Sequence, residues 1–147
     1  MRIIYSFLSV LFLTALSSCK VEPEPINYGQ DACHYCKMNI VDNQHASEFV
    51  TSKGKVYKFD AIECMVNQMK TFEEAPIELL LVCDYSQPGE LCDANSATFL
   101  ISNKIASPMG AYLSAFKDQK VAETKQGEKG GELFTWTQLL EKFKEKH

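Results

Sequence analysis

The 147-residue chain contains a single arginine, Arg2, which precedes an apolar segment at its N-terminus. Residues 19–147 carry 14 lysines against 19 acidic residues, which leaves a net charge of −5. Proteins that bind nucleic acid present basic patches in which arginine contacts phosphates and bases. An acidic chain without arginine is therefore not expected to bind nucleic acid.

The chain also lacks an apolar segment long enough to cross a bilayer as a permanent helix. The apolar run at residues 3–16 is shorter than the roughly 20 residues that such a helix needs. It follows a basic residue and leads into two serines, as in a signal peptide. The ending LSSC at residues 16–19 resembles a bacterial lipobox, which predicts that residues 1–18 are a signal peptide and that Cys19 is lipidated. Cleavage nearby as an ordinary secretory signal is the alternative.

The segment after Cys19, KVEPEPINYGQ, is rich in proline and charge and has no apolar periodicity. This composition is typical of an extended spacer, with a length of about 3.1 Å per residue. We therefore expect residues 19–30 to be the lipidated N-terminus and a linker. Residues 31–147 are long enough for one small compact domain.

The first half of this domain has the pattern of a hairpin, a helix and a strand. Residues 47–59 alternate on either side of Gly54, which can take the positive φ of a tight turn. Asp60 and Glu63 have the spacing of a capping box at the start of an amphipathic helix. The apolar run at residues 77–85 is typical of a buried strand.

The second half repeats this order of elements without repeating the sequence. We predict a second hairpin, a helix and a strand, at residues 97–102 with 104–107, 110–118 and 120–123. Thr135 and Gln138 have the spacing of a capping box before a last amphipathic helix. The sequence thus predicts an α+β domain with an internal duplication and a C-terminal helix.

Six cysteines constrain the chemistry further. Once Cys19 carries lipid, five remain, at positions 33, 36, 64, 83 and 92. Thiols tend to pair in an oxidising exported compartment, and an odd number leaves at least one unpaired. We expect Cys83 and Cys92, which flank a Pro-Gly turn, to form a disulfide. Cys64 is expected to be a small buried residue, because free cysteine is often buried.

The stretch CHYCKM at residues 33–38 places two cysteines, a histidine and a methionine in one loop. A thioredoxin-type redox pair should lie at a helix N-terminus, but the following residues lack a helical apolar stripe. Haem attachment needs a histidine directly after the second cysteine, where this chain has Lys37. A structural zinc site normally has a second ligand pair, and the sequence contains no second C-x-x-C and no H-x-x-H.

Cu(I) fits this loop better, because thiolate and thioether donors select it. Met38 supplies a thioether two residues after Cys36. Met109, between a proline and a glycine, is a second candidate thioether, although a gap-filling core methionine is equally consistent with the pattern. We predict a Cu(I) site with Cys36 and Met38 as its main ligands, helped by Cys33 and Met109. The two histidines at positions 34 and 45 are expected to be ordinary surface residues.

The order of several motifs resembles the NosL family. These motifs are the C-x-x-C-x-M loop behind a lipoprotein signal, YKFDAIEC at residues 57–64, CDY and DAN at 83–85 and 93–95, and SPMGAYLSAF at 107–116. The resemblance covers nearly all of residues 31–125. It implies two similar ββαβ units packed as one compact domain, with a fold like that of the organomercury lyase MerB.

The resemblance also implies a function. NosL proteins are copper-binding lipoproteins of nitrous oxide reductase maturation, so we expect a Cu(I) metallochaperone and not an enzyme. The protein would be tethered to the lipid bilayer in the bacterial envelope and face the periplasm. Its expected partner is nitrous oxide reductase or the membrane transporter of that maturation system. The family motifs fall on Cys33, Cys36, Met38 and Met109, whereas Lys37 stands where a glycine is common.

Two other functions stay open from the sequence. An exported thiol-disulfide oxidoreductase would use Cys33 and Cys36 without a metal, and Met38 would then have no role. A structural lipoprotein with a zinc knuckle would unfold when its metal is removed. Metal analysis together with a thiol count distinguishes these functions from copper transfer.

Overall fold

The computed structural model describes residues 20–144, so the predicted signal peptide and Cys19 lie outside the described residues. The elements are β1 (Ser47–Thr51), β2 (Val56–Phe59), α2 (Ile62–Met69), β3 (Ile77–Cys83), β4 (Leu91–Asp93), β5 (Thr98–Ile101), β6 (Leu113–Phe116), α3 (Gln119–Lys129), β7 (Glu132–Phe134) and α4 (Trp136–Lys144). Among residues 20–144, none of the helices has the length and apolar character needed to span a bilayer.

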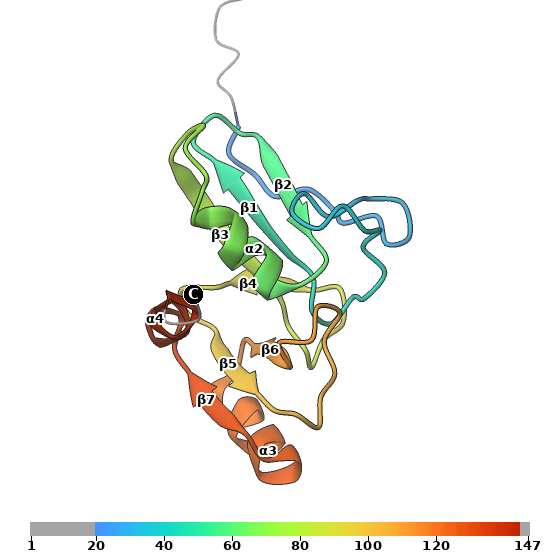
Figure 1. The fold of residues 1–147 in the computed structure, drawn as a ribbon, viewed down its shortest axis with the longest axis vertical. Coiled ribbons are helices and arrows are strands. Elements are labelled where there is room, and N and C mark those ends of the chain that lie inside the picture. Colours follow the sequence, from blue (N-terminus) through green and yellow to red (C-terminus); the bar gives the residue numbers. More distant parts are fainter. Residues whose placement is uncertain (1–19, 145–147) are drawn as a thin grey trace, which may run out of the picture.

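Two antiparallel sheets form the centre of the molecule (Figure 1). The strand order is β2-β1-β3-β4 in the first sheet and β6-β5-β7 in the second. In each sheet the first strand pairs with both the second strand and the strand that follows the helix. The predicted α+β class and the duplication into two ββαβ units are therefore confirmed, while the closer likeness to organomercury lyase stays a prediction.

The first unit forms where the sequence predicts it. The hairpin of residues 47–59 is β1 and β2, and Gly54 has a φ of 76° in its turn. The predicted strand at residues 77–85 contains β3, which pairs with the completely buried β1. Helix α2 buries Ile62 and Met65 against the sheet, in agreement with its apolar face.

The predicted capping box at the start of α2 is wrong. Ala61 is the N-cap residue, and within residues 20–144 no side chain caps the helix. The Asp60 side chain is buried, and its Oδ1 has no hydrogen-bond partner among the described residues. The Glu63 side chain accepts hydrogen bonds from the loop between β5 and β6 in the second unit. Tertiary packing buries both acidic side chains, which sequence spacing does not reveal.

The second unit has the predicted topology but different element positions. The segment predicted as a helix, residues 110–118, contains strand β6, and the predicted strand at 120–123 lies inside helix α3. All four residues of β6 are buried, so its apolar run has no alternation that would distinguish it from a helix. Helix α3 buries only Ala122 and therefore shows no apolar stripe. The predicted strand at 104–107 is a turn and loop.

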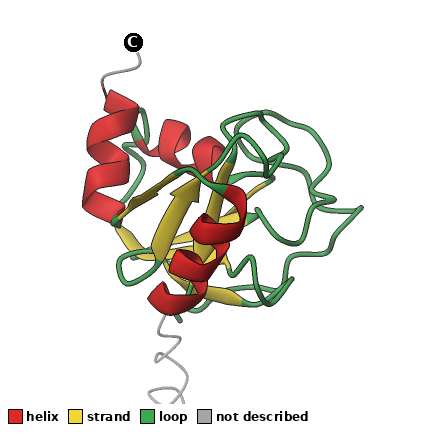
Figure 2. Ribbon diagram, turned by 90° about the horizontal axis from the view of Figure 1, so that it is seen from below, coloured by secondary structure: helices red, strands yellow, loops and turns green. Residues whose placement is uncertain are grey.

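The capping box before the last helix is confirmed. The backbone N–H of Thr135 donates to Oε1 of Gln138 at 2.9 Å, and the backbone N–H of Gln138 donates to Oγ1 of Thr135 at 3.3 Å. Helix α4 then buries Leu139 and Trp136, whose ring lies 5.5 Å from that of Phe99 in β5. In Figure 2 the helices lie around the strands, and the long loops gather on one side of the molecule.

The predicted disulfide between Cys83 and Cys92 is wrong, because both are free thiols. Cys92 pairs with Val82 and Cys83 pairs with Leu91 in the ladder between β3 and β4. The register thus offsets the two cysteines by one residue, which directs their side chains to opposite faces of the sheet. The separation of the two cysteines along the chain is compatible with a closed loop. The register of β3 and β4, however, determines which side chains lie close enough to form a bond.

The segment before Asp31 packs on the domain. Nζ of Lys58 lies 2.8 Å from the carbonyl oxygen of Pro25 and 2.8 Å from Oδ2 of Asp31. The hydroxyl of Tyr28 lies 3.4 Å from Sγ of Cys83. The packed part of the chain thus includes residues upstream of the predicted boundary, and residues 25–30 are not a free spacer.

Candidate metal centre

The cysteine loop is a tight turn closed by its own backbone. The N–H of Cys33 donates to the carbonyl oxygen of Met38 at 2.8 Å, and the N–H of Lys37 donates to that of Cys33 at 3.0 Å. Lys37 adopts a left-handed φ of 67°, which glycine adopts without strain and other residues do not. This turn buries Cys33 and leaves Cys36 half-buried.

A third thiol joins the loop from helix α2. Cys64 lies in the first turn of the helix and is buried. The sulfur atoms of Cys33, Cys36 and Cys64 all lie within 4.8 Å of one another. We call these three residues the thiol cluster. The sequence predicted the first two as ligands and Cys64 as a packing residue, because only the fold brings helix α2 beside the loop.

The three thiols have different affinities for protons. The Cys64 side chain, with the backbone N–H groups of Asp60 and Cys36, lowers the pKa of Cys33. The hydrogen bond to Cys33, together with burial, raises the pKa of Cys64. Burial is also the main cause that raises the pKa of Cys36. Without a metal, Cys33 is therefore the member of the thiol cluster that loses its proton most readily.

The two predicted thioether ligands lie at the surface. Met38 is 47% exposed and Met109 is 41% exposed. Met109 and Cys64 line one pocket of about 280 Å³, and Met38 is not among the residues that line it. The full lining is Tyr35, Glu63, Cys64, Asn67, Met109, Gly110, Ala111 and Phe143. The pocket thus brings one predicted thioether beside one thiol of the cluster.

The position of Met109 is fixed by a buried carboxylate. Oε1 of Glu63 accepts hydrogen bonds from the hydroxyl of Ser107 and the backbone N–H of Ala111, both at 3.2 Å. Gly110 has a φ of 76° in the turn between them. Glu63 directly precedes Cys64, so the same turn of α2 supplies a thiol and holds the loop that carries Met109.

Neither predicted non-ligand histidine belongs to the thiol cluster. The His34 ring packs edge-on against Tyr57, with 4.6 Å between ring centroids. His45 is buried, not at the surface as expected, and bonds Asp42 and Ser114 at 3.0 and 3.1 Å. The His34 ring thus packs on an aromatic side chain, and the His45 ring has two hydrogen-bond partners.

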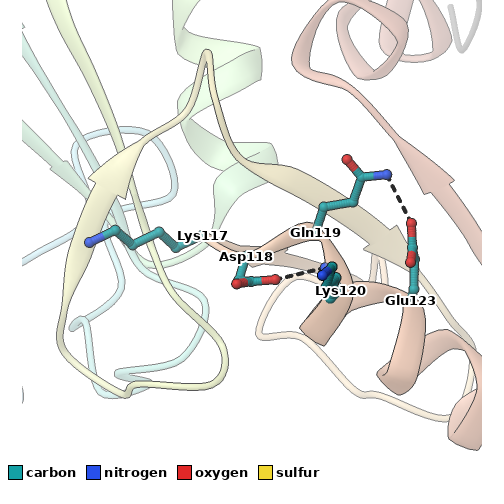
Figure 3. Close-up of a pocket in the computed structure, with 5 residues that line it drawn as sticks. All are labelled: Lys117, Asp118, Gln119, Lys120 and Glu123. Atoms are coloured by element: carbon teal, nitrogen blue, oxygen red, sulfur yellow. Dashed lines mark hydrogen bonds between the residues drawn. The ribbon is translucent and has the colours of Figure 1, made fainter.

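A second hollow, of about 530 Å³, lies at the start of α3 (Figure 3). Its side chains satisfy one another: Asp118 accepts a hydrogen bond from the backbone N–H of Lys120, and Gln119 donates to Glu123. It contains no sulfur ligand. The thiol cluster, and not this hollow, is therefore the candidate metal centre.

A sequence model of one family, NosL, matches residues 25–143. The chain belongs to the NosL family. A relative from Stutzerimonas stutzeri, the copper-binding lipoprotein NosL, is 25% identical over 149 residues, which covers 91% of this chain and 78% of that protein. The crystal structure of the copper chaperone NosL from Shewanella denitrificans superimposes with a TM-score of 0.67. The alignment has 22% identity and covers 78% of this chain and 92% of that one, so it shows a shared NosL fold.

Proposed function

We propose that this protein is a membrane-tethered Cu(I) metallochaperone that supplies copper for assembly of the copper centres of nitrous oxide reductase. The observation that carries the proposal is the thiol cluster, with three sulfur atoms within 4.8 Å beside a pocket lined by Met109. Thiolates and thioethers select Cu(I) over harder ions. Two relatives named for copper binding and copper chaperoning support this choice of metal.

The site suits transfer of an ion more than catalysis. Cu(I) is stable with two or three sulfur ligands, so an acceptor's sulfur can add while a ligand of this chain leaves. Cys36 is half-buried, and the exposed thioethers of Met38 and Met109 are weaker donors that release the ion readily. The proposed role is therefore that of a carrier and not an enzyme.

The tether is inferred from the sequence ending LSSC at residues 16–19. The relative from Stutzerimonas stutzeri is named a lipoprotein, which supports a lipid on Cys19 and a place in the bacterial cell envelope. We expect the folded part to face the periplasm, where it would meet nitrous oxide reductase or its maturation transporter.

A thiol-disulfide oxidoreductase is the second candidate, because neighbouring backbone and thiol groups lower the pKa of Cys33 and Cys36 lies beside it. A thiolate beside a second thiol is the arrangement that such an enzyme needs. The exposed methionines would have no part in this reaction, which makes it the weaker proposal.

Anaerobic titration of the reduced, unlipidated protein with Cu(I), against a competing chelator, tests the proposal. We expect one Cu(I) per chain, bound more tightly than by the Cys36→Ser variant. The control is Cys92→Ser, which removes a buried thiol outside the cluster and should leave the affinity unchanged. Equal copper affinity in all three proteins, with disulfide exchange activity that depends on Cys36, would favour the oxidoreductase.

A further inference from the structure

We propose that Cys64 is the third thiolate ligand of the copper site, and that copper leaves the site on the side of this ligand. At rest the ion would be held by Cys33, Cys36 and Cys64, and it would leave through the pocket that Cys64 shares with Met109. The inference rests on the proposed copper-binding function. It adds the ligand set of the resting state and the route of exit.

The distances within the thiol cluster suit three-coordinate binding. Thiolate sulfur lies about 2.3 Å from a bound metal ion, so three sulfurs around one ion in a plane lie about 4 Å apart. The three sulfur atoms already lie within 4.8 Å of one another. Each sulfur–sulfur distance would have to shorten by less than an ångström for all three sulfurs to bind one ion. Such a shift requires no change in backbone topology.

The surroundings of Cys64 differ from those of a cysteine that only fills the core. The other free thiols of the described chain are Cys83 and Cys92, in strands β3 and β4. Neither belongs to the thiol cluster. Cys64 instead has two sulfur neighbours, which come from a separate loop. A fold that needed only a small apolar group here would not require three unbridged thiols to converge.

Cys64 is also the cluster member that lines the pocket. Cys33 and Cys64 are each 1% exposed and Cys36 is half-buried, whereas Met109 is 41% exposed on the same pocket as Cys64. The thiol cluster therefore opens to solvent at Cys36, and the pocket beside Cys64 is a second opening that also offers the thioether of Met109. Release is a ligand exchange: a bond from copper to an incoming sulfur forms, a bond to a cluster thiolate breaks, and copper stays Cu(I).

X-ray absorption of the Cu(I)-loaded, reduced protein measures the number of short copper–sulfur bonds. We expect three in the parent protein and two in Cys64→Ser, and a Cu(I) affinity for Cys64→Ser that is about tenfold lower or more. Cys92→Ser should match the parent in both measurements. Met109→Ala should keep three short bonds but slow the transfer of Cu(I) to a chelator.

The possible results separate this inference from the proposed function. Two cysteine sulfurs in the parent, or an unchanged affinity and sulfur count in Cys64→Ser while Cys36→Ser binds weakly, would overturn the role of Cys64 and leave the copper function standing. Failure of the parent itself to bind Cu(I) would overturn both. A count of three in the parent that stays three in Met38→Ala and in Met109→Ala assigns all three sulfurs to cysteines, even where Cys64→Ser does not fold.

Discussion

The backbone N–H of Ala111 donates to the buried Oε1 of Glu63 at 3.2 Å, which ties helix α2 of the first unit to a loop of the second. The same oxygen accepts the hydroxyl of Ser107. Met109 lies between these two anchors, and Cys64 directly follows Glu63. One carboxylate thus sets the position of a thioether relative to a thiol, although the two residues come from different halves of the chain.

We expect Glu63→Ala to uncouple Met109 from the copper site. Burial raises the pKa of Glu63, and its Oε2 has no hydrogen-bond partner among the described residues. Neutral hydrogen bonds contribute about 0.5 to 1.5 kcal/mol each, so loss of the two that this side chain accepts should lower the free energy of unfolding by about 1 to 3 kcal/mol. It should also slow the transfer of Cu(I) to a chelator, because the loop would no longer hold Met109 at the pocket.

A double-mutant cycle measures this coupling. Met109→Ala should slow the transfer of Cu(I) to a chelator less in the Glu63→Ala background than in the parent protein. Glu63→Gln, which keeps an oxygen acceptor, is the conservative control and should behave closer to the parent. Additive effects of the two substitutions would show that Glu63 stabilises the fold without positioning Met109.

A second prediction concerns Glu48, which is completely buried in β1. Its Oε1 accepts the backbone N–H of Glu24, and its Oε2 is buried with no hydrogen-bond partner among the described residues. Burial raises the pKa of this carboxyl to about 7, although the nearby Lys58 opposes the shift. The folded protein therefore favours the protonated form, and the unfolded chain ionises at lower pH.

The contribution of Glu48 to stability should be complete below about pH 4.5 and be lost as the pH rises through about 7. Glu48→Gln should remove this pH dependence and raise the free energy of unfolding at pH 8 by about 1 to 3 kcal/mol. Chemical denaturation between pH 5 and pH 8 tests it, with the exposed Glu78→Gln as control. An equal response of both variants to pH would contradict the assignment.

Lys37 provides a third prediction, because its φ of 67° is strained for any residue with a β-carbon. Lys37→Gly should leave the free energy of unfolding within about 1 kcal/mol of the parent value, since relief of the strain offsets the larger entropy of the unfolded chain. Lys37→Val should lower it by about 1 to 2 kcal/mol, since β-branched residues are the least tolerant of this conformation. Thermal unfolding of the metal-free variants would detect the difference, and equal stability of the two would mean that the turn relaxes.

The sequence predicted the first unit well because its signals are local. The alternation around Gly54 and the apolar run of β3 each reflect a period that one element imposes on its own residues. The buried strand β6 and the exposed helix α3 give no such period. The sequence therefore predicted a helix where β6 lies and a strand inside α3. Their common topology could still be inferred, because the order of elements was preserved.

The candidate site was only partly predictable for a similar reason. Cys33 and Cys36 share a short motif, which identifies them without a fold. Cys64 reaches them only through the packing of α2 against the loop, and sequence spacing carries no trace of that contact. The register between β3 and β4 likewise decided that Cys83 and Cys92 stay unbridged.

The last prediction concerns the ligands of the copper site. Cys36→Ser should lower Cu(I) affinity more than Met38→Ala or Met109→Ala, because a thioether is a weaker donor than a thiolate. The apparent affinity should also rise with pH, since each thiol that binds copper must lose its proton. Burial raises the pKa of Cys36, so the rise should continue through neutral pH toward and beyond the ordinary thiol range near 8.5.

Each proton released on binding should steepen this rise by about tenfold per pH unit. Cys36→Ser removes one such proton and should therefore show a shallower pH dependence, whereas Met109→Ala should keep the slope of the parent. Anaerobic chelator competition from pH 6 to pH 9 measures both the affinities and the slopes. Reduced Cys36→Ser and Met38→Ala variants that bind Cu(I) as tightly as the parent would exclude this loop as the copper site and favour a redox role for its cysteines.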